Sequence, residues 1–338
     1  MQRENRKIPF MGVLLKKIVP RIGAVLNIEP KWGSVGQIIF KNGKKIYFRN
    51  SSIDLNTMGA SAVAVDKDYA SYFLNKMGYP VISGRVFYST KWCKVVHSKN
   101  NIDKAYKYAC RIGFPVILKP NSKSQGKGVT KVFNKNEFYK TAERIFKIDN
   151  IMLVQTFIPG KDYRIVVVDK KIISVYERTP LFIIGDGTSS IEKLLSLKQK
   201  EFLITGRDTI IDFDDFRVKA NLKRANLSLK SILKKEEKIY LLDNANLSTG
   251  GLSLDVSKKI HPSFKKVAIS ITKDMGLRLC GVDIIVKGDI EKKISKNNQY
   301  FVLEINSAPG LDNYYASGKK QKKIVEELYL NLLKAMSK

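Results

Sequence analysis

The ten residues Phe301-Val-Leu-Glu304-Ile-Asn306-Ser-Ala-Pro-Gly310 start as an apolar run typical of a β-strand and end in a Pro-Gly turn. Because side chains alternate between the two faces of a strand, Glu304 and Asn306 share one face. A second apolar run, beginning Gly281-Val-Asp283, carries another carboxylate. Carboxylate and amide oxygens are hard ligands that suit Mg²⁺ bridging substrate phosphates, so these three side chains are candidate metal ligands. Salt bridges to the many lysines of the chain are the alternative.

Upstream, a lysine-bearing strand leads into a glycine-rich turn, in Ile117-Leu-Lys119-Pro-Asn-Ser-Lys-Ser-Gln125-Gly126-Lys-Gly128. Backbone N–H groups and an ammonium suit a phosphate chain, and glycine has no Cβ to block the approach of an anion. The turn lacks the G-x-x-x-x-G-K-[ST] spacing of a P-loop. Taken alone, such a segment is more often a basic surface hairpin than a phosphate-binding turn.

A third segment, Val154-Gln155-Thr-Phe-Ile158-Pro-Gly160-Lys-Asp162-Tyr-Arg164, reads as a strand, a bend and a second strand. Backbone groups at such a strand edge suit an adenine rim, and the carboxylate of Asp162 suits two ribose hydroxyls. A hairpin with a surface aspartate is the alternative.

Two further features suit anions. The turn-rich stretch Asn244–Gly251 is compatible with a loop over a substrate or with a plain connection. Arg178 stands in a chain that mostly uses lysine, and a guanidinium fork suits an oxyanion or acylphosphate better than a point charge does. Pairing of Arg178 with Glu177 or Asp186 is the structural alternative.

Composition bounds the function. The 338 residues are 44% hydrophobic, which excludes global disorder, and 61 basic against 31 acidic residues give a net charge of +30. This charge favours anionic partners, but lysine is scattered along the chain and looks compositional. No block of five or six consecutive basic residues is present, so a nucleic-acid partner is not expected.

No apolar run approaches the roughly 20 residues of a membrane span, and the run Phe10–Leu15 ends at two lysines. A membrane association and a secretory signal are therefore not expected. Cys93, Cys110 and Cys280 form no C-x-x-C pattern, and the chain has only two histidines. We expect a reduced, cytoplasmic protein without a disulfide framework or structural zinc.

Hydrophobic periodicity predicts mixed strands and helices, hence an α+β or α/β architecture. The predicted strands cover 115–118, 151–155, 163–168, 171–176, 282–286 and 301–305. The predicted helices cover 67–77, 103–112, 136–146, 190–197, 263–275 and 320–336. Near the start, Asn42-Gly43 between two apolar runs predicts a β-hairpin with a type I′ turn.

Taken in order, these segments resemble the ATP-grasp superfamily of carboxylate–amine ligases, in particular the ATP-grasp domains of cyanophycin synthetase and of bifunctional glutathione synthetase. The similar region runs over about 59–318, after a short N-terminal segment 1–58 and before a C-terminal helix 319–338. The resemblance implies an α+β fold in which two subdomains clasp ATP, with a charged insert at 188–245. The matching segments are Ala64–Lys67, Gly113–Pro120, Gly126–Val129, Gly160–Arg164, Ile184–Gly187, Asn246–Gly251, His261-Pro262, Gly281–Asp283 and Glu304–Gly310.

The resemblance also implies roles for individual residues. Lys67 and Lys119 would hold the ATP phosphates, and the loop Gln125–Gly128, with Gly126 and Gly128, would cover them. The adenine hinge would be Gln155–Ile158 and the ribose ligand Asp162. The implied Mg²⁺ ligands, expected to hold two ions, are Asp283, Glu304 and Asn306, and Arg178 would contact the reacting carboxylate.

The implied activity is an ATP-dependent ligase that joins a carboxylate to an amine through an acylphosphate and releases ADP and phosphate. Small-molecule or peptide substrates are expected, an acidic one among them, and a homo-oligomer is compatible with the sequence. A ligase that modifies ribosomal peptides and a non-catalytic protein that binds nucleotide or polyanion are the alternatives. Segment 1–58 is shorter than the N-terminal domain that usually helps such ligases bind the acceptor, and no second, P-loop ATPase domain follows.

Overall fold

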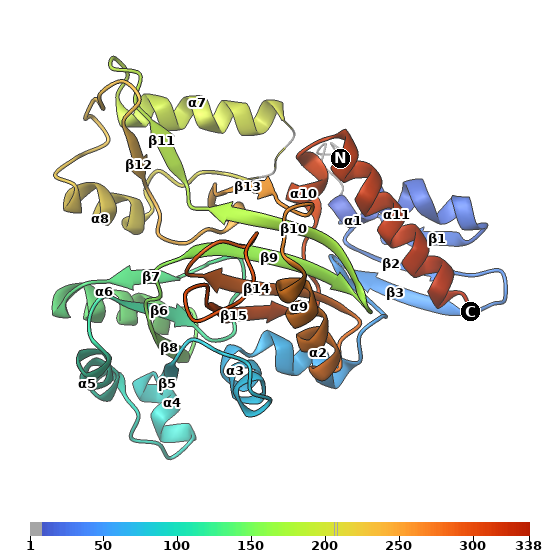
Figure 1. Cartoon of the computed structure of the whole chain (residues 1–338), viewed down its shortest axis with the longest axis horizontal. Coiled ribbons are helices and arrows are strands. Elements are labelled where there is room, and N and C mark those ends of the chain that lie inside the picture. Colours follow the sequence, from blue (N-terminus) through green and yellow to red (C-terminus); the bar gives the residue numbers. More distant parts are fainter. Residues whose placement is uncertain (1–8, 206, 208) are drawn as a thin grey trace.

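A computed structural model describes residues 9–205, 207 and 209–338 of the chain. At its centre lies a five-stranded antiparallel sheet in the order β13-β10-β9-β14-β15 (Figure 1). The α+β architecture expected from the periodicity is confirmed. The five strands are β9 (Lys161–Val168), β10 (Lys171–Thr179), β13 (Leu252–Asp255), β14 (Leu279–Val286) and β15 (Tyr300–Asn306).

One face of this sheet is apolar over most of β9, β14 and β15. Tyr163, Ile165 and Val167 alternate along β9 and pack, with β14 and β15, against three helices. Branched and aromatic side chains favour such a half-buried pleated surface. The covering helices are α2 (Met58–Val65), α3 (Lys67–Lys76) and α9 (Pro262–Asp274).

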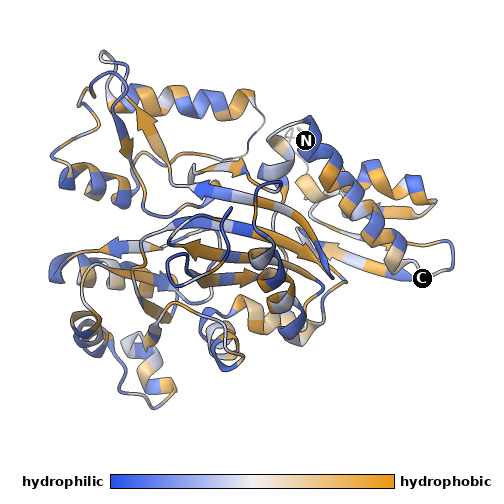
Figure 2. Cartoon of the chain, viewed as in Figure 1, coloured by the Kyte–Doolittle hydropathy of each residue, from blue (hydrophilic) through white to orange (hydrophobic). Residues whose placement is uncertain are grey.

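The opposite face is divided into an apolar half and a polar half. Val166, Val168 and Leu279 belong to a core made with the leading segment and the C-terminal helix. Toward the other end the same face carries Asp162 and Arg178, and Figure 2 shows β10 changing from orange to blue in that direction. The polar half is therefore the part of the sheet that the leading segment leaves free.

The leading segment is more elaborate than the single hairpin expected. It contains a helix and four antiparallel strands, and α11 packs against it (Figure 1). The elements are α1 (Phe10–Ile18), a 3-10 turn (Val19–Ile22), β1 (Val25–Ile28), β2 (Val35–Ile39), β3 (Lys45–Arg49), β4 (Ser52–Ile53) and α11 (Lys319–Met336).

The hairpin between β2 and β3 is confirmed, but the predicted type I′ turn is wrong. That turn needs a positive φ at both central residues, whereas only Gly43 has one, at 83°. Phe40 N donates to Lys44 O at 2.9 Å, so residues 41–43 form the loop. Asn42 instead accepts the amide of Lys44 on its side chain at 3.1 Å, a local bond that fits the longer loop.

A second, smaller sheet stands beside the first in the order β5-β8-β6-β7. Its core joins strand residues such as Val116 and Val154 to helix residues such as Phe138. This unit delivers Lys119 and the glycine-rich loop. Its elements are β5 (Gly84–Tyr88), α4 (Thr90–Val95), α5 (Ile102–Ile112), β6 (Val116–Pro120), β7 (Thr130–Val132), α6 (Lys135–Phe146) and β8 (Ile151–Thr156).

The charged insert 188–245, whose role the periodicity does not reveal, contributes most of a third unit with a core of its own. The helix predicted at 190–197 is present but extends much further. Leu195, Val218 and Leu222 are buried between its helices. The elements are β11 (Phe182–Ile184), α7 (Ile191–Ile204), α8 (Phe216–Arg224) and β12 (Lys238–Tyr240), and α10 (Asp312–Ala316) lies after β15.

The predicted strands and helices are otherwise all present. Several strands are longer than expected, and for the site the important cases are β9, which begins at Lys161, and β10, which continues to Thr179. Asp162 and Arg178 consequently lie inside neighbouring strands rather than in loops. In the part of the chain that the structure describes, no helix is both long and apolar enough to cross a membrane.

Candidate functional site

A cleft of about 500 Å³ separates the central sheet from the smaller one. Its walls combine the polar half of the central sheet with the start of α3, β6, β8 and the glycine-rich loop. Seven of the residues predicted from sequence line it: Lys67, Lys119, Gln125, Gln155, Arg178, Glu304 and Asn306. Five others lie outside this lining: Gly126, Gly128, Ile158, Asp162 and Asp283.

Strand register brings charged residues of the central sheet into one transverse row. Arg164 on β9 faces Asp283 on β14, which in turn faces Glu304 on β15. Arg164 donates from Nε and Nη2 to both oxygens of Asp283 at 2.6 Å, and its Nη2 lies 3.8 Å from Glu304 Oε1. Burial alone would raise the pKa of Asp283, but Arg164 and Arg178 more than offset it and the pKa lies below its usual value.

A second pair lies beside this row. Arg178 Nη2 is 2.6 Å from Asp162 Oδ1 and 2.9 Å from Asp283 Oδ2, and the Arg178 side chain is only 3% exposed. Burial raises the pKa of Asp162 to about 6, although the charge of Arg178 opposes the rise. The alternative partners considered for Arg178, Glu177 and Asp186, are not the ones it uses.

Across the cleft lie two partly or fully buried lysines. Lys67 Nζ donates to the carbonyls of Asn121 at 3.0 Å and Lys123 at 2.6 Å. Within the described residues the ammonium of Lys119 has no hydrogen-bond acceptor, and the residue is 3% exposed. Burial lowers the pKa of Lys119 to about 8, while the charge of Glu304 opposes the fall. A buried ammonium without a partner is costly, so an anionic ligand would be stabilising there.

The position of Lys67 follows from the way α3 begins. Asp66 accepts the amides of Asp68 and Tyr69 at 3.0 Å on Oδ1, which makes it the N-cap of the helix. Its other oxygen accepts Asn121 Nδ2 at 2.8 Å. One carboxylate thus joins the helix that carries Lys67 to the strand end that follows Lys119.

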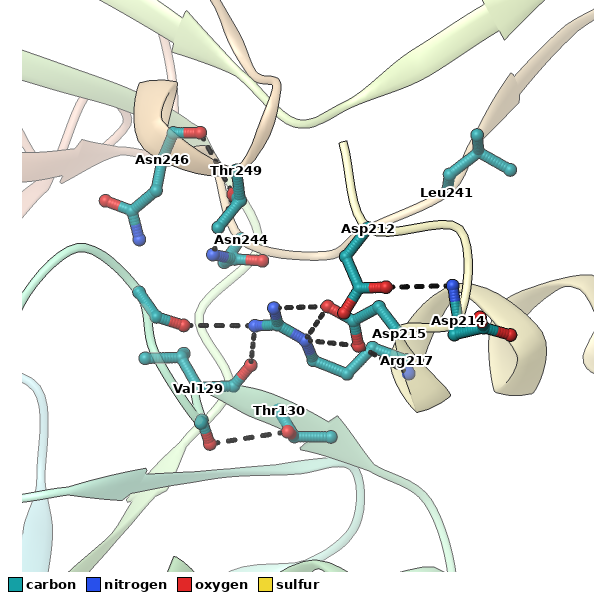
Figure 3. Close-up of polar contacts among 12 residues, drawn as sticks. Val129, Thr130, Asp212, Asp214, Asp215, Arg217, Leu241, Asn244, Asn246 and Thr249 are labelled. Carbon is teal, nitrogen blue, oxygen red and sulfur yellow. Dashed lines mark hydrogen bonds and ion pairs between the residues drawn. The ribbon is translucent and has the colours of Figure 1, made fainter. Parts of the chain in front are cut away.

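The glycine-rich loop adopts backbone conformations that favour glycine. Gln125, Gly126 and Gly128 have φ angles of 59°, 68° and 75°. A Cβ at Gly126 would collide with the amide groups of Asn244 and Asn246. Figure 3 shows these two side chains beside the loop. The Asn244–Gly251 stretch therefore packs onto the loop, as an element that closes over it.

The chain is similar to known protein families over two of its segments and to known proteins over most of its length. Residues 73–184 match the family model described as "D-ala D-ala ligase C-terminus", and residues 243–328 match the "RimK-like ATP-grasp domain". The chain is 33% identical to the glutathione biosynthesis bifunctional protein GshAB of Clostridium perfringens over 69% of its own length and 31% of that protein. It is 31% identical to the cyanophycin synthetase of Geminocystis herdmanii, over 75% of its own length and 28% of the relative.

The fold is shared with a crystal structure of a bifunctional glutathione synthetase from Pasteurella multocida. That structure aligns with 94% of this chain and 43% of its own, with a TM-score of 0.58 at 24% identity. This chain belongs to the ATP-grasp superfamily. It spans less than a third of the length of the two curated relatives described above.

Two oxygen-bearing side chains of this ATP-grasp cleft, Glu304 and Asn306, fit a metal ion. No group of three or more His, Cys, Asp or Glu residues suited to a metal occurs among the described residues. Glu304, with 26% of its side chain exposed, and Asn306 line the cleft, and Asn306 Nδ2 is buried without a partner. An amide can be turned end for end to present its oxygen, so this pair fits a cation. Asp283 fits less directly, because both of its oxygens receive guanidinium hydrogen bonds.

The residues expected from sequence to contact adenine lie at and just after the end of β8. Gln155 is 4% exposed and donates through Nε2 to Ile82 O at 3.3 Å, whereas Ile158 follows the strand and is half-buried. Asp162 is held by Arg178, so a contact between Asp162 and ribose stays a prediction.

Three parts of this ATP-grasp site were not assigned from sequence. Arg164 stands two residues after Asp162 on the same strand face, and that period-two spacing was the available signal. The leading segment supplies Phe10 and residues 50–52 to the cleft lining, which no local pattern indicates. Arg217, which contacts the glycine-rich loop, lies in a segment without a recognised motif.

Proposed function

We propose that this chain is an ATP-dependent ligase that joins a carboxylate to an amine. The γ-phosphoryl group of ATP passes to the substrate carboxylate, giving an acylphosphate and ADP. The amine then attacks the acyl carbon, the amide bond forms, and phosphate leaves with the electrons of the broken C–O bond. The observation that carries the proposal is that one cleft combines the buried Lys119 and the partly buried Lys67 with Glu304, Asn306 and Arg178. In phosphoryl transfer a protein acts mostly by positioning groups and neutralising charge, which this set of side chains suits.

Within the proposed site, Lys67 and Lys119 neutralise the phosphate chain and the loop Gln125–Gly128 covers it. The unpartnered ammonium of Lys119 supports this role, because an anion would satisfy it. The backbone after Gln155, up to Ile158, would meet the adenine rim. Asp162 would reach ribose only by giving up part of its pairing with Arg178.

Glu304 and Asn306 would hold Mg²⁺, with Asp283 as a further ligand if its arginine contacts rearrange. When bound, the ion would neutralise charge on the transferring phosphoryl group. The two residues lie two positions apart on β15, so one strand face presents both oxygens.

Arg178 would contact the reacting carboxylate and the oxyanion that develops from it. Its guanidinium is held on one side by Asp162 and on another by Asp283, so it reaches the cleft with a restricted orientation. Because Nε and Nη2 of Arg178 are taken up by these two aspartates, its Nη1 is the nitrogen that would meet a carboxylate oxygen.

For the substrates, we propose an amino acid or peptide carboxylate and an amino-acid amine, one of the two acidic. The names of the relatives, which refer to glutathione and cyanophycin, support this class. The net charge of +30 favours the approach of both ATP and an acidic co-substrate.

The proposal is tested by measuring ADP release during a screen of amino acids and dipeptides, with the product identified by mass spectrometry. We expect substrate-dependent ADP release in the parent, and a loss of at least about a hundredfold in Glu304→Gln because a charged metal ligand is removed. Glu291→Gln is the matched control, since that carboxylate is 47% exposed and pairs with Lys259 away from the cleft. Near-parental turnover in Glu304→Gln would contradict the metal assignment, and ATP binding without any product would favour the non-catalytic alternative.

A further inference from the structure

The insert 188–245 contacts the glycine-rich loop directly, through Arg217 at the start of α8 (Figure 3). Arg217 Nη1 donates to the carbonyl of Gly126 at 3.0 Å and to that of Val129 at 3.1 Å. One guanidinium nitrogen thus spans the second half of the loop. A third loop carbonyl, that of Gln125, accepts Ser248 Oγ at 3.1 Å from the neighbouring loop.

Arg217 is itself held in place before it reaches the loop. Its Nε lies 3.0 Å from Asp215 Oδ1, and its Nη2 lies 2.6 Å from Asp215 Oδ2. The same aspartate accepts the backbone amide of Arg217 at 2.9 Å and caps α8. Because the cap and the ion pair share one carboxylate, the guanidinium is oriented by the helix start, and its side chain is only 11% exposed.

The helix that carries Arg217 is docked on the smaller sheet by stacked cations. Arg144 of α6 lies 4.1 Å from the ring centre of Phe216, and Arg224 lies 4.0 Å from that of Phe133. Such contacts between a guanidinium and an aromatic ring are attractive. α8 therefore reaches the loop from a fixed position, as part of the wall of the nucleotide subdomain.

These contacts use carbonyl acceptors of the loop and none of its amide donors. Lys127 N and Val129 N bond within the loop, to Ser124 O and Gly126 O, both at 3.2 Å. In the described part of the chain, the amides of Gly126 and Gly128 donate to no acceptor. Free N–H groups in a turn can donate to an anion, and glycine has no Cβ to block the approach of that anion. The loop is thus fixed through its carbonyls, with amides left for a phosphate.

We propose that Arg217 is a positioning residue that holds the glycine-rich loop in its phosphate-binding conformation before nucleotide arrives, so that the insert forms part of the nucleotide site. The reason is entropic, because a loop that is already ordered loses less conformational freedom when nucleotide binds. The affinity for nucleotide is therefore higher. The inference rests on the proposed function for the identity of the ligand, but not for the ordering of the loop.

The test compares Arg217→Ala and Arg217→Lys with Lys219→Ala. Lys219 lies on the same helix, 54% exposed, and pairs with Asp214, so its removal takes one positive charge from α8 without touching the loop. Trypsin cleavage after Lys123 and Lys127 of the nucleotide-free protein is followed by mass spectrometry, and ADP affinity is measured by calorimetry.

We expect cleavage in the loop to be about tenfold faster and ADP binding about tenfold weaker in Arg217→Ala, with kcat at saturating ATP within about twofold of the parent. Arg217→Lys is expected between the two, because an ammonium reaches a carbonyl but cannot keep the fork with Asp215. Lys219→Ala should match the parent. Parental loop cleavage in Arg217→Ala would overturn the proposal, as would a general rise of cleavage at all sites with a lower melting temperature. Failure of the parent to bind ADP, with the loop still loosened in Arg217→Ala, would contradict the proposed function and leave the ordering role standing.

Discussion

Among single residues, Lys119 is the one whose burial lowers its pKa in a way that a bound anion would reverse. Its ammonium is enclosed at 3% exposure, and burial lowers its pKa to about 8 against the opposing charge of Glu304. A bound polyphosphate would favour the charged form and raise this pKa again. Nucleotide binding should therefore take up a proton when the pH lies above the pKa of the free protein.

The consequence is a pH dependence of nucleotide affinity with a defined sign. Below about pH 8 the lysine is already charged and affinity is constant; above it, affinity falls by up to tenfold per pH unit. We expect the Kd for ADP to be about tenfold higher at pH 9 than at pH 7, measured by calorimetry with a fixed metal concentration. In Lys119→Met the affinity should be weaker and flat over this range. A parental profile that is flat in the same range would place Lys119 outside the nucleotide site.

Among the secondary elements, α3 is the one whose N-cap affects both the stability of the helix and the position of Lys67. Asp66 caps the helix and also accepts the side chain of Asn121 near the glycine-rich loop. Asp66→Ala should lower the free energy of unfolding by about 1–2 kcal/mol, because the N-cap of α3 is lost. It should also raise the KM for ATP, because the helix start that carries Lys67 is then no longer held in place.

Asn134 gives the matched control for this prediction. It caps α6 by accepting the amide of Glu137 at 3.0 Å and is not part of the cleft lining. Asn134→Ala should cost a similar unfolding free energy in a urea titration and leave the KM unchanged. Equal KM values in the two alanine variants would show that the Asp66 cap stabilises the helix without serving the site.

Over the whole molecule, the leading segment completes the core of the central sheet. Leu15 on α1 is fully buried in the cluster that contains Val166 and Leu279, while Val13 on the same helix is 53% exposed. Leu15→Ala should lower the free energy of unfolding by about 2–5 kcal/mol, and Val13→Ala by little, in a denaturant titration. Similar small losses in both variants would mean that the leading segment is an appendage rather than part of the core.

Much of the fold and part of the site could be predicted from sequence, because the signals were local. Apolar alternation located the predicted strands, and helical periodicity located α3, α5, α6, α9 and α11 within one or two residues. Glu304 and Asn306 were placed on one strand face by their spacing, and both line the cleft. The glycine-rich loop was predicted because glycine has no Cβ to block an anion, and in the structure Gly126 and Gly128 also have positive φ angles, as does Gln125.

The amino-acid sequence by itself thus determined the secondary elements, the family resemblance and the residue types gathered at the cleft, since each depends on neighbours within a few positions. Only the tertiary structure decided the partners of those residues. The pairing of Arg178 with Asp162 and Asp283 depends on the register of three strands, and the contact of Arg217 with the loop joins segments about ninety residues apart. The division of the central sheet into covered and open halves depends on where α1 and α11 pack. These contacts arise from strand pairing and burial between distant segments, which no periodicity within one segment encodes.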